Sequence, residues 1–326
     1  MKGIGKNIYK ILGFAISIIC LYFAFRGIQW IQVALTFKKA SYLGLISSVL
    51  FQLLSLAIAG FRWKMVINLP EVSWASTSAS MMVGLMANNI FPGRIGEFVR
   101  PILLGHETKK SRSFLFATVV IDRLSDLLVL VILGLLSFGI FPFIPWARQM
   151  AIIGGVLLVS ALLVVGIFSY SNIGSKIERM VNQLGPSRFY EKMAHSLQKL
   201  RLGFRSIQSI QRGAAVFGLS WLVWAAWFLF LYYALSAFKL ILPMWGMILL
   251  LSTLNLGGLV PSSPGYAGTY HLLAIIVLSN FAIKKEEALG FVLVFHALWY
   301  VPQTLLGLIV LIKKNLNLWQ LLETEK

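Results

Sequence analysis

Apolar stretches of about 20 residues alternate with short polar segments along nearly the whole chain. A helix needs about 20 consecutive apolar residues to cross the hydrocarbon core of a bilayer, because each residue rises about 1.5 Å. Six uninterrupted stretches have this length: 8–28, 41–61, 114–141, 147–169, 213–236 and 288–312. The pattern therefore predicts an all-α integral membrane protein with about six full transmembrane helices.

Two further apolar regions, 74–105 and 244–281, are broken near their middles. Pro92-Gly93 interrupts the first, and Pro261 and Pro264-Gly265 interrupt the second. Proline removes a backbone donor and glycine favours non-helical backbone, so each region is predicted to form two helices. The helices either cross the bilayer twice with a short turn or form a re-entrant hairpin. The return segment 94–105 rises only about 18 Å, which favours the hairpin.

The broken regions share a motif that indicates an inverted repeat. P-G-x-x-G occurs at 92–96 and again at 264–268, 172 residues later. If the six full stretches cross the membrane, the two hairpins enter from opposite sides, as in transporters built from inverted halves. The repeats are predicted at about 1–141 and 147–312 within a single membrane domain. The predicted hairpin tips contain Pro92, Gly93, Gly96, Pro264, Gly265 and Gly268.

Basic residues are distributed unequally between the two sets of loops. With both termini in the cytoplasm, the cytoplasmic side collects 19 basic residues, Arg62 and Lys64 among them, and the outer side collects 7. This asymmetry follows the positive-inside rule and predicts a multi-pass protein of the cytoplasmic (inner) membrane. The segment 171–212 contributes eight basic and two acidic residues and is predicted to be an amphipathic element on anionic lipid.

Composition excludes several classes of protein. The chain is 58% hydrophobic and 12% charged, with a mean hydropathy of +0.82, which leaves little room for a soluble domain. The net charge of +18 lies in loops between apolar stretches, so it indicates lipid headgroups and not nucleic acid. Cys20 is the only cysteine, and neither a nucleotide-binding nor a hydrolase motif is present. We therefore expect no enzyme activity, cofactor or metal.

Charged residues within the apolar regions are the candidate site. Arg94, Glu97 and Arg100 fall at i, i+3 and i+6, so they are predicted to share a broad helical face. The run "IDRLSD" adds Asp122, Arg123 and Asp126 near the middle of the third full stretch. Intramembrane charges usually mark a substrate or ion path, although a purely structural ion-pair network is the alternative. The six charges sum to zero.

The more specific interpretation of these charges is a site that binds an anionic lipid headgroup. Arginine's planar guanidinium suits phosphate, and both return helices would begin at the hairpin tips with free N–H groups. The carboxylates would orient the arginines or carry a proton. Asn88 and Asn89 lie beside the first break and are predicted to cap freed backbone groups; Asn89 is also a candidate contact. His271 and His296 are further candidates, either as hydrogen-bonding partners or as a proton relay.

Three runs carry a family resemblance: "FPGRIGEFVRPILLG", "TVVIDRLSDLLVL" and "VPSSPGYAG". The chain resembles the lysylphosphatidylglycerol synthase transmembrane (flippase-like) family over nearly its whole length. The resemblance implies an integral domain that moves lipids between leaflets. In two-domain synthases an aminoacyltransferase domain follows, whereas this chain stops at Lys326, so synthase activity is not expected. The chain departs from the family pattern at Tyr266, His271 and His296.

These observations predict a flippase-like transporter of an anionic lipid, either a phospholipid such as aminoacyl-phosphatidylglycerol or a polyprenyl-phosphate carrier. The alternatives are a secondary transporter of a small soluble anion and a non-transporting partner of a lipid-modifying enzyme. Membrane lipids are the expected partners, with a homo-oligomer or a lipid-modifying enzyme as further possibilities.

Overall fold

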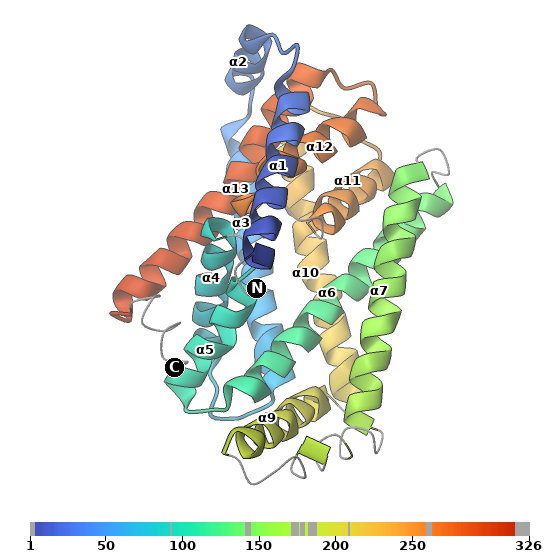
Figure 1. The fold of residues 1–326 in the computed structure, drawn as a ribbon. Coiled ribbons are helices and arrows are strands. Elements are labelled where there is room, and N and C mark those ends of the chain that lie inside the picture. Colours follow the sequence, from blue (N-terminus) through green and yellow to red (C-terminus); the bar gives the residue numbers. More distant parts are fainter. Residues whose placement is uncertain are drawn as a thin grey trace.

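A computed structural model describes residues 4–91, 93–140, 145–170, 176, 180–181, 188–207, 209–258 and 263–316. Every regular element in these ranges is a helix (Figure 1). The α-helices are α1 (Ile4–Phe25), α2 (Trp30–Lys38), α3 (Tyr42–Ile67), α4 (Trp74–Ile90), α5 (Gly96–Thr108), α6 (Arg112–Ile140), α7 (Pro145–Tyr170), α9 (Arg188–Phe204), α10 (Ile210–Ala237), α11 (Met244–Gly257), α12 (Thr269–Ser279) and α13 (Lys285–Lys313). Two short 3₁₀ helices are η1 (Arg205–Ile207) and η2 (Pro264–Tyr266).

All six predicted spans coincide with helices, namely α1, α3, α6, α7, α10 and α13. Within the described residues, α3, α10 and α13 are each long and apolar enough to cross a membrane, and α1 with α2 forms a bent pair that qualifies as a fourth span. Helix α6 carries Asp122, Arg123 and Asp126 in its middle, which lowers its apolar character. The chain is a multi-pass membrane protein, and six crossings remain a prediction.

Both predicted breaks are confirmed, because each interrupted region is a pair of helices, α4–α5 and α11–α12. The base of α4–α5 lies at the C-terminal end of α3, where Lys110 pairs with Glu71 in the loop between α3 and α4. The base of α11–α12 lies at the opposite end of α3, because the backbone N–H of Ser41 donates to the carbonyl of Ala237 just before α11. The two pairs therefore run inward from opposite ends (Figure 1). Their re-entrant placement in a bilayer remains a prediction.

Local chemistry fixes where these helices start and stop. Ser41, Ser73 and Ser209 cap α3, α4 and α10, each accepting a hydrogen bond from a backbone N–H three residues later. Asn68 (φ 53°) and Lys109 (φ 57°) take left-handed conformations that end α3 and α5. Helix α3 thus extends six residues beyond the predicted stretch 41–61.

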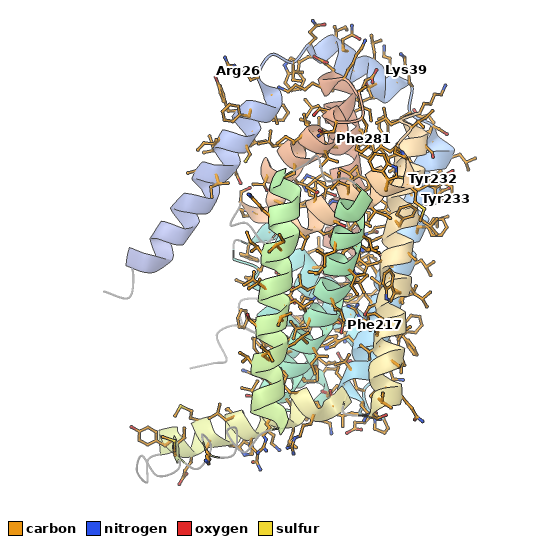
Figure 2. All side chains as sticks on the ribbon, turned by 90° about the vertical axis from the view of Figure 1, so that its right-hand side faces the viewer. Arg26, Lys39, Phe217, Tyr232, Tyr233 and Phe281 are labelled. Carbon is orange, nitrogen blue, oxygen red and sulfur yellow. The ribbon has the colours of Figure 1, made fainter. Side chains whose placement is uncertain are left out.

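Helix α2 was not predicted. It turns 84° away from the last part of α1 and lies across the end of the molecule, with Arg26 and Lys39 on either side of it (Figure 2). It packs on α13, where Gly290 leaves room for Thr36.

The predicted amphipathic segment 171–212 is described only in part. Its helix α9 lies across the other end of the molecule (Figures 1 and 2). Gly203 packs against the Phe114 carbonyl and Ala117, which joins α9 closely to the start of α6.

Candidate functional site

Three carboxylates and three arginines form one ion-pair network where α3, α5, α6 and α10 meet. Asp122 on α6 lies at its centre and is completely buried. Its Oδ1 accepts a hydrogen bond from Arg62 Nε at 2.9 Å, and its Oδ2 accepts hydrogen bonds from Arg100 Nη2 and Arg123 Nη2, each at 3.1 Å. A buried carboxylate needs compensating donors, and Asp122 has three cationic ones.

Arg62 is a member of the network that the sequence pattern did not indicate. Its side chain is 0% exposed, so its assignment to a cytoplasmic loop is wrong. Besides Asp122, it donates from Nη1 to Asp126 Oδ1 at 2.6 Å and to Ser220 Oγ at 2.9 Å. It is buried because α3 continues through this position and turns Arg62 toward α6 and α10.

Glu97 joins the hairpin helix α5 to the same network. Its carboxylate accepts a hydrogen bond from Asn88 Nδ2 at 3.2 Å and pairs with Arg100 at 3.4 Å and Arg123 at 3.6 Å. The Arg100 guanidinium also lies 4.4 Å from the ring centroid of Trp63, a cation–π contact. Arg100 is buried, and its guanidinium is held by protein groups.

Arg94 lies apart from this network, so the prediction that it shares a helical face with Glu97 and Arg100 is wrong. It precedes α5 and has a left-handed conformation with φ 52°, which turns its side chain toward the second hairpin. There Nη2 donates to the Gly258 carbonyl at 2.6 Å, and the guanidinium lies 5.6 Å from the centroid of the Tyr266 ring. Arg94 therefore joins the two hairpin tips.

The start of α5 differs from the expected anion site with free N–H groups. Gly96 N–H donates to Asn88 Oδ1 at 2.8 Å, which confirms the predicted cap. The next two N–H groups donate to the carbonyls of Arg94 and Ile95. Because these donors are already used, the prediction of free N–H groups is wrong for α5, and positive charge at this tip comes mainly from Arg94.

Charge is balanced within the network but not at the tips. Arg62, Arg100 and Arg123 offset Glu97, Asp122 and Asp126, whereas Arg94 has no carboxylate partner among the residues described. The set thus carries a formal net charge of +1. Two of its cations face outward: Arg94 is exposed, and the Arg123 side chain is 38% exposed.

The tip residues pack closely against neighbouring helices. Gly265 lies against Tyr300 on α13, and Gly268 lies against the backbone of Ser17 on α1. Asn89 donates from Nδ2 to Thr304 Oγ1 at 2.9 Å, which joins α4 to α13. Gly93 is exposed, with φ 81°, and predicted tip residue Pro92 lies outside the described residues.

His271 and His296 meet although 25 residues separate them. His296 Nδ1 lies 3.4 Å from His271 Nε2, while His271 Nδ1 accepts a hydrogen bond from the Gly268 N–H at 3.3 Å. Tyr270, Trp299 and Tyr300 surround the His296 ring. His271 thus caps the start of α12, and neither imidazole joins the ion-pair network.

Outside the membrane helices, one loop carboxylate has a shifted pKa. A hydrogen bond from Lys110 holds the pKa of Glu71 below its usual range. Across the described chain no three His, Cys, Asp or Glu side chains are grouped so that they could hold a metal ion.

The fold and this network define an all-helical, multi-pass membrane protein with buried, paired charges. The family model described as lysylphosphatidylglycerol synthase TM region matches residues 10–307, and the chain belongs to this family. It is 26% identical to a UPF0104 membrane protein of Methanothermobacter thermautotrophicus, over 76% of this chain and 79% of that protein. It is 23% identical to a UPF0104 membrane protein of Pyrococcus horikoshii, over 95% of this chain and 97% of that protein. No solved protein structure matches the chain.

Proposed function

We propose that this protein moves an anionic, phosphate-bearing lipid across the cytoplasmic membrane. The observation that carries the proposal is Arg94, a cation without a carboxylate partner in the described structure, placed where two oppositely directed hairpins touch. Family membership supports a lipid-related role. The shared ligand chemistry is a phosphate on a lipid, either a phospholipid such as aminoacyl-phosphatidylglycerol or a polyprenyl phosphate.

A lipid phosphate would compete with the Gly258 carbonyl for Arg94. A phosphate oxygen carries more negative charge than a carbonyl oxygen and accepts stronger hydrogen bonds from guanidinium. Binding would then loosen the contact between the hairpin tips, and Arg123, whose side chain is partly exposed, would offer a second cation. Phosphate binding and separation of the tips are thereby coupled.

The neutral network would hold the hairpin in place while Arg94 exchanges partners. Asp122 and Arg62 tie α3 to α6, and Glu97 and Arg100 tie α5 to both. We expect Arg100 to position the hairpin and not to contact the lipid, because its side chain is buried. Among the carboxylates of the network, the side chains of Glu97 (21% exposed) and Asp126 (16% exposed) reach water, whereas Asp122 is fully buried.

Lipid retention tests the proposed headgroup contact. Native mass spectrometry of the protein purified in mild detergent should find an anionic lipid on the wild type. Losing a charged hydrogen bond costs about 1.5–3 kcal/mol, so Arg94→Gln should retain that lipid about tenfold to hundredfold less. Lys313→Gln, which also removes one exposed positive charge but at the C-terminal end of α13, is the control and should retain wild-type levels.

Equal retention by Arg94→Gln and the wild type would contradict the role of Arg94. Retention of a soluble phosphate compound in place of lipid would favour the small-anion transporter. If no lipid is retained and activity appears only beside a lipid-modifying enzyme, the partner alternative is favoured.

We also propose that α9 and the C-terminal end of α13 lie on the cytoplasmic side. Single cysteines at the exposed positions Lys109 and Lys313, in a Cys20→Ser background, should react with impermeant maleimide only when the cytoplasmic face is accessible. Cysteines at Lys39 and Lys284 should react from outside. Lys39 lies at the opposite end of the molecule (Figure 2), and Lys284 directly precedes Lys285, whose Nζ donates to the Arg26 carbonyl at that end. Labelling of Lys109 and Lys284 from the same side would contradict the opposed hairpins.

A further inference from the structure

Helix α2 presents an apolar outer face that no described helix covers. Val33 and Thr36 point toward α13, whereas Ile31, Ala34 and Leu35 lie on the other side of the helix. Ile31 is 68% exposed and Trp30 is 58% exposed. The 84° bend after α1 places this face at the end of the molecule.

The same apolar surface continues onto a membrane helix. Tyr42, Leu43 and Ile46 in the first turns of α3 are all highly exposed and follow α2 after three residues. Helix α3 is one of the helices long and apolar enough to cross a membrane, so its exposed side faces lipid. The outer face of α2 is thus the edge of a lipid-facing surface.

Charge around α2 favours an anionic surface. Arg26, Lys38 and Lys39 are exposed at the two ends of α2, and the first acidic residue of the chain is Glu71, far from this end. The neighbouring loops and the start of α13 add Lys239, Lys284 and Lys285 against Glu286 and Glu287. Six basic and two acidic residues give this end a net charge of +4, which attracts anionic lipid headgroups.

A second copy of the chain is a less suitable partner than lipid for the exposed face of α2. Helix α2 has nine residues and is about 14 Å long, and a stable dimer buries about 800 Å² on each partner, more than one face of so short a helix offers. An amphipathic helix with an aromatic residue at one end and basic residues at the other is typical of a helix in the membrane interface.

We propose that α2 lies in the surface of the anionic leaflet at the end opposite α9, with Ile31 and Leu35 inserted among the lipids and Arg26, Lys38 and Lys39 on the headgroups. This inference does not depend on the transport proposal, because it concerns only where α2 lies.

Depth-dependent quenching of a fluorescent probe, on the protein reconstituted in liposomes, tests this position of α2. An environment-sensitive fluorophore (NBD) is attached to a single cysteine at Ile31 in a Cys20→Ser background, with a cysteine at Lys284 as the water-facing control. Nitroxide lipid with a shallow spin label should quench the probe at Ile31 several-fold more than at Lys284, and iodide should quench it several-fold less. Adding phosphatidylglycerol to phosphatidylcholine vesicles should increase the lipid quenching at Ile31.

The triple variant Arg26→Gln/Lys38→Gln/Lys39→Gln should lose that increase while keeping its helical content by circular dichroism. Iodide quenching at Ile31 equal to that at Lys284 would overturn the proposal, since the helix would then face water. Protection from both quenchers would also overturn it, because a protein partner would cover the face. A probe at Leu35 repeats the measurement if the Ile31 label perturbs folding.

Discussion

Asp122→Asn should make the purified protein unfold at a much lower concentration of denaturant than the wild type. The substitution leaves three arginines facing two carboxylates in a buried network. Removing one partner of a buried ion pair typically costs about 3–5 kcal/mol, and Asp122 serves three partners. Unfolding in mixed micelles with increasing sodium dodecyl sulfate, followed by circular dichroism, measures the loss.

Two further variants test whether the loss of stability comes from the unbalanced buried charge or from the changed Asp122 side chain itself. Asp126→Asn should cost about 1–3 kcal/mol, because Asp126 is partly exposed and Arg62 keeps Asp122 and Ser220. Arg62→Met combined with Asp122→Asn restores two arginines against two carboxylates and should recover part of the stability. Wild-type stability in Asp122→Asn would show that the network does not hold these helices together.

Gly96→Ala should separate α5 from α4 and destabilise the first hairpin. A Cβ at this position would lie 1.8 Å from the Gly84 carbonyl oxygen, a backbone atom that cannot move aside alone. Overpacking costs about 1–3 kcal/mol and occasionally more. Glu97 and Arg100 follow directly on α5, so the same movement should weaken their ion pairs, and the denaturant assay should report both losses together.

Gly218→Ala is the matched control for this prediction. Gly218 is an exposed residue of α10, and the methyl group of an alanine there would have no neighbouring atom within 4 Å. The free energy of unfolding of Gly218→Ala should therefore equal that of the wild type or exceed it by up to about 1 kcal/mol, because alanine favours a helix more than glycine does. If Gly96→Ala and Gly218→Ala behave alike, the close approach of α4 and α5 is not important for stability.

Most helices and both breaks could be predicted from the sequence, because apolar length and Pro-Gly pairs are local signals. Arg62 was misplaced for a related reason: it follows an apolar run and precedes Lys64, so it resembles the start of a loop. A different local signal was present. Ser48, Gln52, Ser55, Ala59 and Arg62 recur at spacings of three and four, which places Arg62 on the small and polar face of one continuing helix.

Arg94 was misplaced because helical spacing was applied across a break. The i, i+3, i+6 pattern holds only if the helix already exists at Arg94, and the left-handed residues Gly93 and Arg94 place it outside α5. The proximity of His271 to His296, and of Arg94 to Gly258, depends on contacts between distant segments, so one sequence gives no local signal for either.

Transbilayer movement of lipid in reconstituted vesicles tests the central claim most directly. A tail-labelled fluorescent anionic phospholipid, and separately a short polyprenyl phosphate, is followed with an impermeant reductant that bleaches only the outer leaflet. Wild-type protein should speed the anionic lipid above the protein-free rate without nucleotide and should move a zwitterionic analogue more slowly. Arg94→Gln, matched for stability and protein density, should lower the anionic rate about tenfold or more, as expected for a lost charged hydrogen bond. Equal rates for wild type and Arg94→Gln on every lipid, including any lipid that copurifies, would contradict the account.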